Sequence, residues 1–146
     1  MSRDPSVHTT ITSIGLFSGC TRTEHSLIEQ LATVVEVDES TVLCAEGEIG
    51  QTFYVLARGE VLVEVDGHEI ARLGPGCGFG EIALLRPGGR RIATVTTATS
   101  CQLVLFSRPE FATLMAEAPR LAHDLAAESR RRLEPRGGGS GPFATS

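Results

Sequence analysis

The sequence predicts a mainly β domain of the sandwich or barrel type, and three observations carry this prediction. The chain is rich in glycine, with 16 among its 146 residues. From about residue 41 to residue 106, short segments of β-branched and apolar residues alternate with glycine-containing turns. Their spacing of roughly 8–12 residues is typical of all-β folds rather than of βαβ units. Helical periodicity occurs only before and after this region, so we expect helices to flank the sheets.

The length suits a single domain. We expect residues 1–14 to form a flexible N-terminal arm because they are polar and lack periodicity. Residues 15–134 form the predicted domain, and residues 135–146 form a flexible Gly/Ser-rich tail.

The first predicted helix spans about residues 22–34. Thr21 and Glu24 fit a capping box, in which each side chain satisfies a free backbone amide. Apolar residues then recur at helical spacing: Leu27, Ile28, Leu31, Val34 and Val35. The helix should end where residues 35–38 begin to alternate between apolar and charged side chains.

Six strands are predicted in the central region, each rich in β-branched or apolar residues. They span residues 41–45, 52–58, 61–65, 69–73, 92–97 and 101–106. Asp66 and Gly67 separate two of these strands and predict a tight hairpin, because both turn positions tolerate positive φ.

Two helices are predicted after the strands. Ser107 and Glu110 repeat the capping-box pattern before a helix that runs to about residue 116. Pro119 can begin a second helix, and one face of it carries Leu121, Leu125, Ser129 and Leu133. Pro135 stops this helix directly after its basic last turn.

Composition excludes several classes of protein. A formal net charge of −5 argues against broad electrostatic binding to nucleic acid or anionic membranes, although not against one local basic site. No apolar run has the length of a membrane-spanning helix, and the N-terminus lacks a signal-peptide pattern. We therefore expect a cytoplasmic location.

The cysteines and histidines predict neither a metal site nor catalysis. Cys20, Cys44, Cys77 and Cys101 are widely spaced, and in a reducing compartment free thiols are expected. No nucleophile–base pattern is visible. A cupin-like metalloenzyme would need clustered His and carboxylate ligands, which the strands lack.

Residues 78–85 differ from the ordinary pattern of strands and turns. Gly78 and Gly80 stand close together, and the residues after Gly80 suit a short helix. The free N–H groups at a helix N-terminus favour an anion, and glycine lets the anion approach the backbone. Arg91 opens an apolar strand, and its planar guanidinium fits a phosphate. A plain turn, with Arg91 paired to Glu81 or to an exposed acid, remains an alternative interpretation.

Residues 79–85 (FGEIALL) and 91–95 (RIATV) closely resemble the phosphate-binding cassette of cyclic nucleotide-binding domains. Residues 46–50, 53–56 and 59–61 are similar to the family's first, glycine-punctuated strands. The resemblance covers roughly residues 14–134. It implies an antiparallel β-roll, or jelly-roll, of about eight strands, with an N-terminal helix, a short cassette helix and two C-terminal helices.

The resemblance also implies roles for individual residues. Arg91 would pair with the exocyclic phosphate oxygens, and backbone amides near Ile82 and Ala83 would complete that anion site. Glu81 would accept a hydrogen bond from the ribose 2′-hydroxyl. Gly80 would let the sugar come close.

An apolar wall around the sugar and base is matched by Val63, Val65 and Leu73, each of which is equally suited to plain core packing. Arg132 is a candidate lid over the ligand, although an arginine at a helix end is usually solvated.

Two departures from the family pattern concern the cassette. Arg90 stands where many members have proline. Ile92 carries no hydroxyl, whereas members that favour cGMP commonly have Thr or Ser there. The expected ligand is therefore cAMP, with cGMP as the second candidate.

We predict a non-catalytic sensor that binds a cyclic nucleotide, needs no further cofactor, and signals through its C-terminal helices to an unknown effector protein. The sequence shows no DNA-binding domain and no membrane span. A homodimer is compatible with the resemblance, although the last helix is short. The alternative is a jelly-roll interaction or assembly domain that no longer binds nucleotide. The joint presence of Gly80, Glu81 and Arg91 argues against it.

Overall fold

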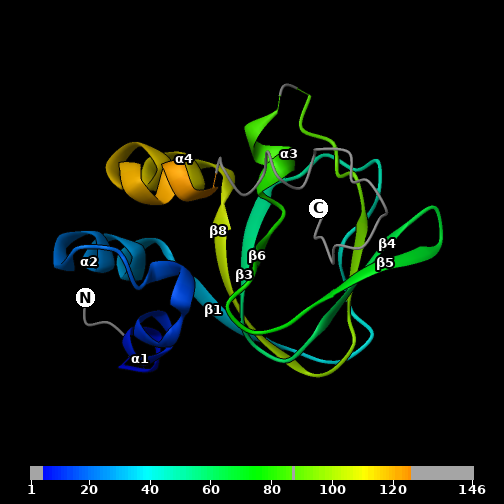
Figure 1. Ribbon diagram of the computed structural model, residues 1–146, viewed down its shortest axis with the longest axis horizontal. Coiled ribbons are helices and arrows are strands. Elements are labelled where there is room, and N and C mark those ends of the chain that lie inside the picture. The colour runs from blue at the N-terminus through cyan, green and yellow to red at the C-terminus, as the bar shows by residue number, and fades with distance from the viewer. Residues whose placement is uncertain (1–4, 87, 126–146) are drawn as a thin grey trace.

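The computed structural model describes residues 5–86 and 88–125, and these residues form two four-stranded antiparallel sheets (Figure 1). In the first sheet the order is β1 (Thr33–Val37), β8 (Cys101–Ser107), β3 (Thr52–Arg58) and β6 (Gly78–Phe79). In the second it is β2 (Val42–Cys44), β7 (Thr94–Thr97), β4 (Val61–Val65) and β5 (His68–Leu73). The mainly β class and the flanking helices are confirmed.

Most helices lie together beside the first sheet (Figure 1). They are α1 (Pro5–Ser13), the 3₁₀ turn η1 (Gly15–Phe17), α2 (Arg22–Leu31), α4 (Arg108–Glu117) and the helical residues 119–125. The short helix α3 (Glu81–Leu85) lies apart from them, between β6 and β7 in the chain. Among the described residues, no helix has the length and apolar character that a membrane span requires.

Both predicted capping boxes are present. Thr21 Oγ1 accepts a hydrogen bond from the Glu24 amide at 3.1 Å, and Ser107 Oγ accepts one from the Glu110 amide at 3.3 Å. Helix α2 ends three residues earlier than predicted. The β-branched residues 33–35 pair with β8 instead, because they suit a half-buried strand better than a helix.

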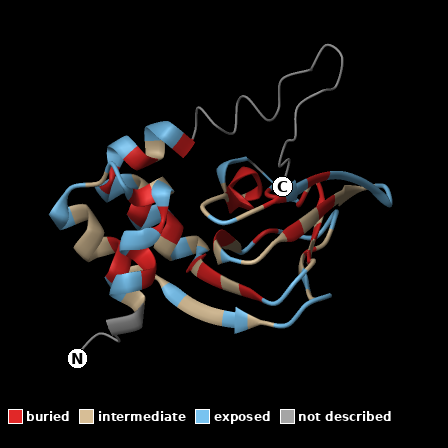
Figure 2. Cartoon of the chain, turned by 60° about the horizontal axis from the view of Figure 1, so that its bottom comes forward, coloured by how far each residue is buried: buried red, intermediate tan, exposed pale blue. Residues whose placement is uncertain are grey.

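Strand β3 separates two apolar cores. Phe53 and Val55 face the helices, where they join Phe106 and Phe111. Tyr54 lies among the residues between the two sheets. In Figure 2, buried segments occur both in the helices and in the strands, with exposed residues on the outer sides of the helices. Alternation along β3 therefore makes both of its faces buried.

The prediction of a flexible N-terminal arm is wrong for residues 5–14. These residues include helix α1, in which Ile11 is fully buried, and Ile14 is also buried. Val7, Ile11 and Ile14 fall at i, i+4 and i+7, a narrow apolar stripe among Thr and Ser residues. Helix α1 was not predicted because its residues are mostly polar, and tertiary packing stabilises it. Residues 1–4 lie outside the described residues.

Several boundaries differ from the predictions. Strand β7 begins at Thr94 rather than at residue 92, and β6, which was not predicted, pairs with β3 through Tyr54 and Phe79. The predicted hairpin is confirmed, since Asp66 and Gly67 have φ values of 53° and 80°. The second C-terminal helix is described only to residue 125; its predicted remainder and the tail lie outside the described residues.

Candidate functional site

Gly80 occupies the turn between β6 and α3, where it is the N-cap of the helix with φ 89° and ψ −7°. A Cβ at this position would lie 2.7 Å from Arg91 Nη1 and 3.0 Å from the Thr52 carbonyl oxygen. Both the left-handed backbone and the close approach therefore require glycine here.

Arg91 lies directly against this turn and is only 6% exposed. Its Nη1 donates to the Gly80 carbonyl at 2.9 Å, and its Nη2 donates to the Thr52 carbonyl at 2.8 Å. Its Cζ lies 5.9 Å from the centre of the Tyr54 ring, within the range of a cation–π contact. These contacts bring the guanidinium, the start of α3 and strand β3 to one place.

Residues 47–50 hold the other side of Arg91. The Arg91 amide donates to the Glu48 carbonyl at 2.7 Å, and the Gly47 amide donates to the Arg91 carbonyl at 2.9 Å. A Cβ on Gly50 would lie 2.6 Å from Ala83 Cβ and 3.0 Å from Arg91 Cζ. The backbone of this segment thus packs tightly against both α3 and the guanidinium.

The predicted residues of the first turn of α3 gather around the same point. Glu81, Ile82 and Ala83 are buried, with the Glu81 side chain 0% exposed, and Ile92 is half-buried. The structure therefore brings these residues together with Gly80 and Arg91. Their contacts with a ligand stay predictions.

The predicted apolar wall lies on the second sheet. Val63 on β4 and Leu73 on β5 are buried between the sheets, and half-buried Val65 packs against them. Tyr54 and Phe79 belong to the same core. Core packing accounts for all three predicted residues, and contact with a ligand stays a prediction. Arg132 lies outside the described residues.

Sequence reasoning missed Thr52 and Tyr54. Thr52 contributes a backbone carbonyl, for which no side-chain signal exists. Tyr54 stacks on Phe79 with ring centres 5.0 Å apart, and its hydroxyl donates to the Leu43 carbonyl at 2.9 Å. Burial raises the pKa of Tyr54, an effect that Cys44 increases and Arg91 opposes. Of these two residues, Tyr54 could have been noticed in the sequence, because it is the single tyrosine of the chain.

Cys44 is buried beside the charged residues of the cassette. Burial raises the pKa of its thiol to about 11, with Arg91 lowering the pKa and Glu81 raising it. The thiol is therefore protonated at neutral pH. All four cysteines are free in the structure. Among the described residues, no group of three potential metal ligands comes together.

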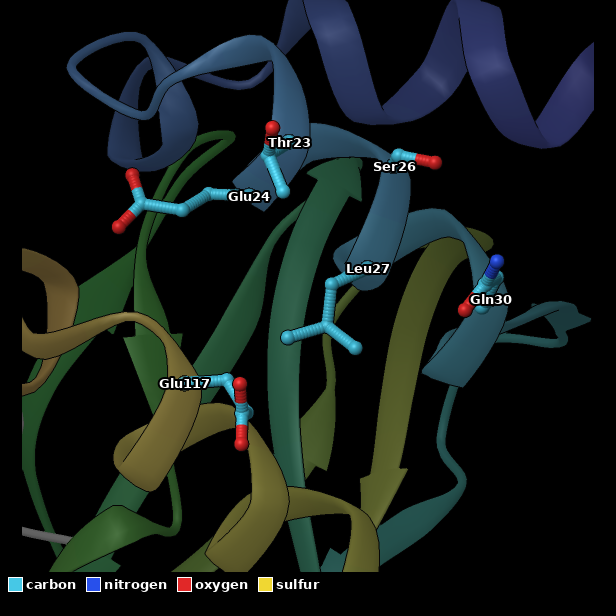
Figure 3. A pocket seen from close by; sticks show the side chains of 6 residues that line it. All are labelled: Thr23, Glu24, Ser26, Leu27, Gln30 and Glu117. Carbon is cyan, nitrogen blue, oxygen red and sulfur yellow. The ribbon is translucent and has the colours of Figure 1, made fainter.

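A surface hollow of about 320 Å³ opens on the cassette loop and is lined by Arg86, Gly88, Arg90, Arg91 and Ile92. A second hollow of about 250 Å³ lies between α2 and α4 (Figure 3). Its lining contains none of the predicted site residues: Thr23, Glu24, Ser26, Leu27, Gln30 and Glu117. Of these two hollows, only the one on the cassette loop, the cassette hollow, is lined by predicted site residues, namely Arg91 and Ile92.

Known proteins are similar to this chain in sequence and in fold. The chain is 34% identical over 102 residues to a cyclic nucleotide-gated potassium channel of Rhizobium etli. The aligned region covers 70% of this chain and 27% of the channel. It is 39% identical over 93 residues to the cyclic AMP receptor protein of Thermus thermophilus, over 60% of this chain and 43% of that protein. The chain thus spans less than half the length of these two curated relatives.

The fold is also similar to that of a solved structure, cAMP-bound PfPKA-R. The TM-score is 0.78 at 22% identity, over 87% of this chain and 44% of that chain.

The cyclic nucleotide-binding domain family matches residues 34–118, more than half of the chain. This match includes the Gly80 turn, helix α3, Arg91 and the strands around them. It supports the predicted non-catalytic role, because these domains are regulatory. From the cassette geometry and this match we conclude that the chain belongs to the cyclic nucleotide-binding domain family.

Proposed function

We propose that the domain binds a cyclic nucleotide monophosphate at the cassette formed by Gly80, α3 and Arg91, with cAMP preferred weakly over cGMP. The observation that carries the proposal is the buried Arg91 guanidinium beside the Gly80 turn. We further propose a cytoplasmic sensor that needs no other cofactor and acts on a separate effector protein.

Arg91 suits a phosphate because its buried guanidinium has N–H donors that the protein does not use. A guanidinium carries five N–H donors, and the Gly80 and Thr52 carbonyls each take one hydrogen bond. A phosphate could accept two parallel hydrogen bonds from the planar group, an arrangement that is stronger than neutral hydrogen bonding.

Glu81 would provide selectivity for a ribose. Its carboxylate would accept a hydrogen bond from the 2′-hydroxyl, and a 2′-deoxy ligand would leave that bond unmade. Ile92 offers no hydroxyl to a guanine, which favours adenine as the base.

A direct path links the cassette to the C-terminal helices. Arg108, the first residue of α4, donates through Nη2 to the Gly50 carbonyl, and a Cβ on Gly89 would lie 2.9 Å from the same Nη2. A ligand that moves the cassette would therefore disturb the start of α4. Such a shift requires that the ligand bind one arrangement of the helices more tightly than the other.

Calorimetric titration with cAMP and cGMP tests the proposal. We expect the parent to bind both, cAMP more tightly, and Arg91→Ala to weaken binding by roughly 1.5–3 kcal/mol, the range for hydrogen bonds to charged groups. Arg91→Lys keeps the charge but loses the planar fork, so its affinity should fall between the two.

Arg58→Ala is the matched control, because Arg58 is exposed at the end of β3 and lies 3.8 Å from Glu36. Its affinity should equal that of the parent. Failure of the parent to bind either nucleotide, or full affinity in Arg91→Ala, would contradict the proposed function and favour an interaction domain without a nucleotide ligand.

A further inference from the structure

The cassette hollow has an unusual lining. All five residues come from the loop between α3 and β7, and three of them are arginines. Arg86 and Arg90 are exposed, whereas Arg91 is buried. The lining of the hollow therefore includes an outer, exposed pair, Arg86 and Arg90, beside the buried Arg91.

The hydrogen-bonding partners of the outer pair differ from those of a typical surface arginine. Within residues 5–86 and 88–125, neither Arg86 nor Arg90 forms an ion pair with a carboxylate. Arg90 Nη1 donates to a neutral acceptor, the Gly47 carbonyl, at 2.7 Å. By contrast, Arg72 pairs with Glu60 and Glu69, each at 3.0 Å. The loop thus carries local positive charge in a chain whose formal net charge is −5.

We infer that Arg86 and Arg90 form an outer subsite for a phosphate-type anion, which captures the ligand's phosphate before Arg91 binds it. The inference rests on the proposed function for the identity of the physiological ligand. Uncompensated guanidinium groups at the mouth of a hollow attract an anion over several ångströms, and such steering raises association rates by roughly 10–1000-fold. Their effect belongs to association rather than to the final complex, because exposed groups contribute little to the bound state.

Surface plasmon resonance on the full chain, over an immobilised cAMP analogue, separates association from dissociation. At low salt we expect Arg86→Gln/Arg90→Gln to associate about tenfold more slowly than the parent, with an unchanged dissociation rate. The difference should shrink as salt is raised, because screening shortens the reach of exposed charges.

Arg22→Gln/Arg120→Gln is the control pair. Both residues are exposed on the helices, so this variant loses the same two charges without touching the cassette. Its association rate should stay within about twofold of the parent's, since steering depends on local charge. The parent and the Arg86→Gln/Arg90→Gln variant, called the cassette variant, are compared at every salt concentration. Equal association rates throughout would overturn the inference while leaving nucleotide binding intact.

Inorganic pyrophosphate provides a readout that does not need a cyclic nucleotide. In a titration followed by backbone amide NMR, we expect signals of Gly88 and Arg90 to shift in the parent and not in the cassette variant. If the parent binds pyrophosphate in this way but no cyclic nucleotide, the subsite stands and the proposed function falls. If pyrophosphate shifts neither signal, or shifts them equally in both proteins, the subsite falls.

Discussion

Arg91 owes its position to atoms that have no side-chain signature. Two backbone carbonyls accept hydrogen bonds from its guanidinium, and Gly50, which has no side chain, leaves room for the guanidinium. The sequence predicted Arg91, Gly80 and Glu81 because their residue types carry the chemistry. It could not predict Thr52, because any residue at that position supplies a carbonyl.

Gly80 allows a test of this packing at a single atom. Gly80→Ala adds a Cβ at φ 89° that lies 2.7 Å from Arg91 Nη1, so we expect a loss of stability and of ligand affinity. Gly76→Ala is the matched control, because Gly76 has φ 94° but nothing within 4 Å of its added Cβ. Urea denaturation should show a loss of about 1–2 kcal/mol for Gly76→Ala from the backbone alone. Gly80→Ala should lower the free energy of unfolding by more than Gly76→Ala does. Equal losses would mean that Arg91 can move away from the added Cβ without a loss of stability.

Cys44 makes stability depend on alkaline pH. Its folded-state pKa of about 11 lies above the ordinary value of 9.0, so above pH 9 the unfolded chain releases the proton first. The free energy of unfolding should therefore be level below about pH 8.5 and fall by about 2 kcal/mol by pH 10.5. Denaturation of Cys44→Ala, followed by circular dichroism over the same range, should show a smaller fall. The raised pKa of Tyr54 accounts for part of the fall that remains. The same slope in both proteins would contradict a role for this thiol.

At the scale of the elements, local signals predicted what local chemistry determines. The two capping boxes, the Asp66–Gly67 hairpin and the extents of β3 and β4 all follow from short-range patterns. Strand β6 was missed because its two residues are strand only through pairing with β3. Helix α1 was missed because its apolar stripe is narrow, and its stability comes from the core that it covers.

The integration of α1 into the core can be measured. Ile11 is fully buried, so Ile11→Ala should lower the free energy of unfolding by about 2–5 kcal/mol. Thr12→Ala on the exposed side of the same helix should change it by less than about 0.5 kcal/mol. A loose arm would make the two variants equivalent, and urea denaturation distinguishes these outcomes.

In the whole molecule, β3 joins the cassette to the helices. One face of the strand reaches Arg91 through Tyr54, and the other packs Phe53 against Phe111 of α4 at a ring-centre distance of 5.2 Å. The family match and the two-sheet fold agree at this scale with the sequence prediction. The course of the last predicted helix lies beyond the described residues.

Ligand binding should therefore stabilise the entire domain against heat. At a concentration of 100 times Kd, a cyclic nucleotide adds about 2.7 kcal/mol to the free energy of unfolding. In a domain of this size that corresponds to a rise in Tm of roughly 5–10 °C, which calorimetry detects. Arg91→Ala at the same nucleotide concentration should show a much smaller rise. A rise of parental size in that variant would place the binding site outside the cassette.

The position of Tyr54 has a practical consequence. The chain contains no tryptophan and no second tyrosine, so its intrinsic ultraviolet emission comes almost entirely from this ring. The ring lies 5.9 Å from Arg91 Cζ, and its hydroxyl is tied to the Leu43 carbonyl. A phosphate that draws the guanidinium away would change the electric field at the ring. We therefore expect the fluorescence of Tyr54 to change if a phosphate binds to Arg91, which would allow binding to be followed without a label.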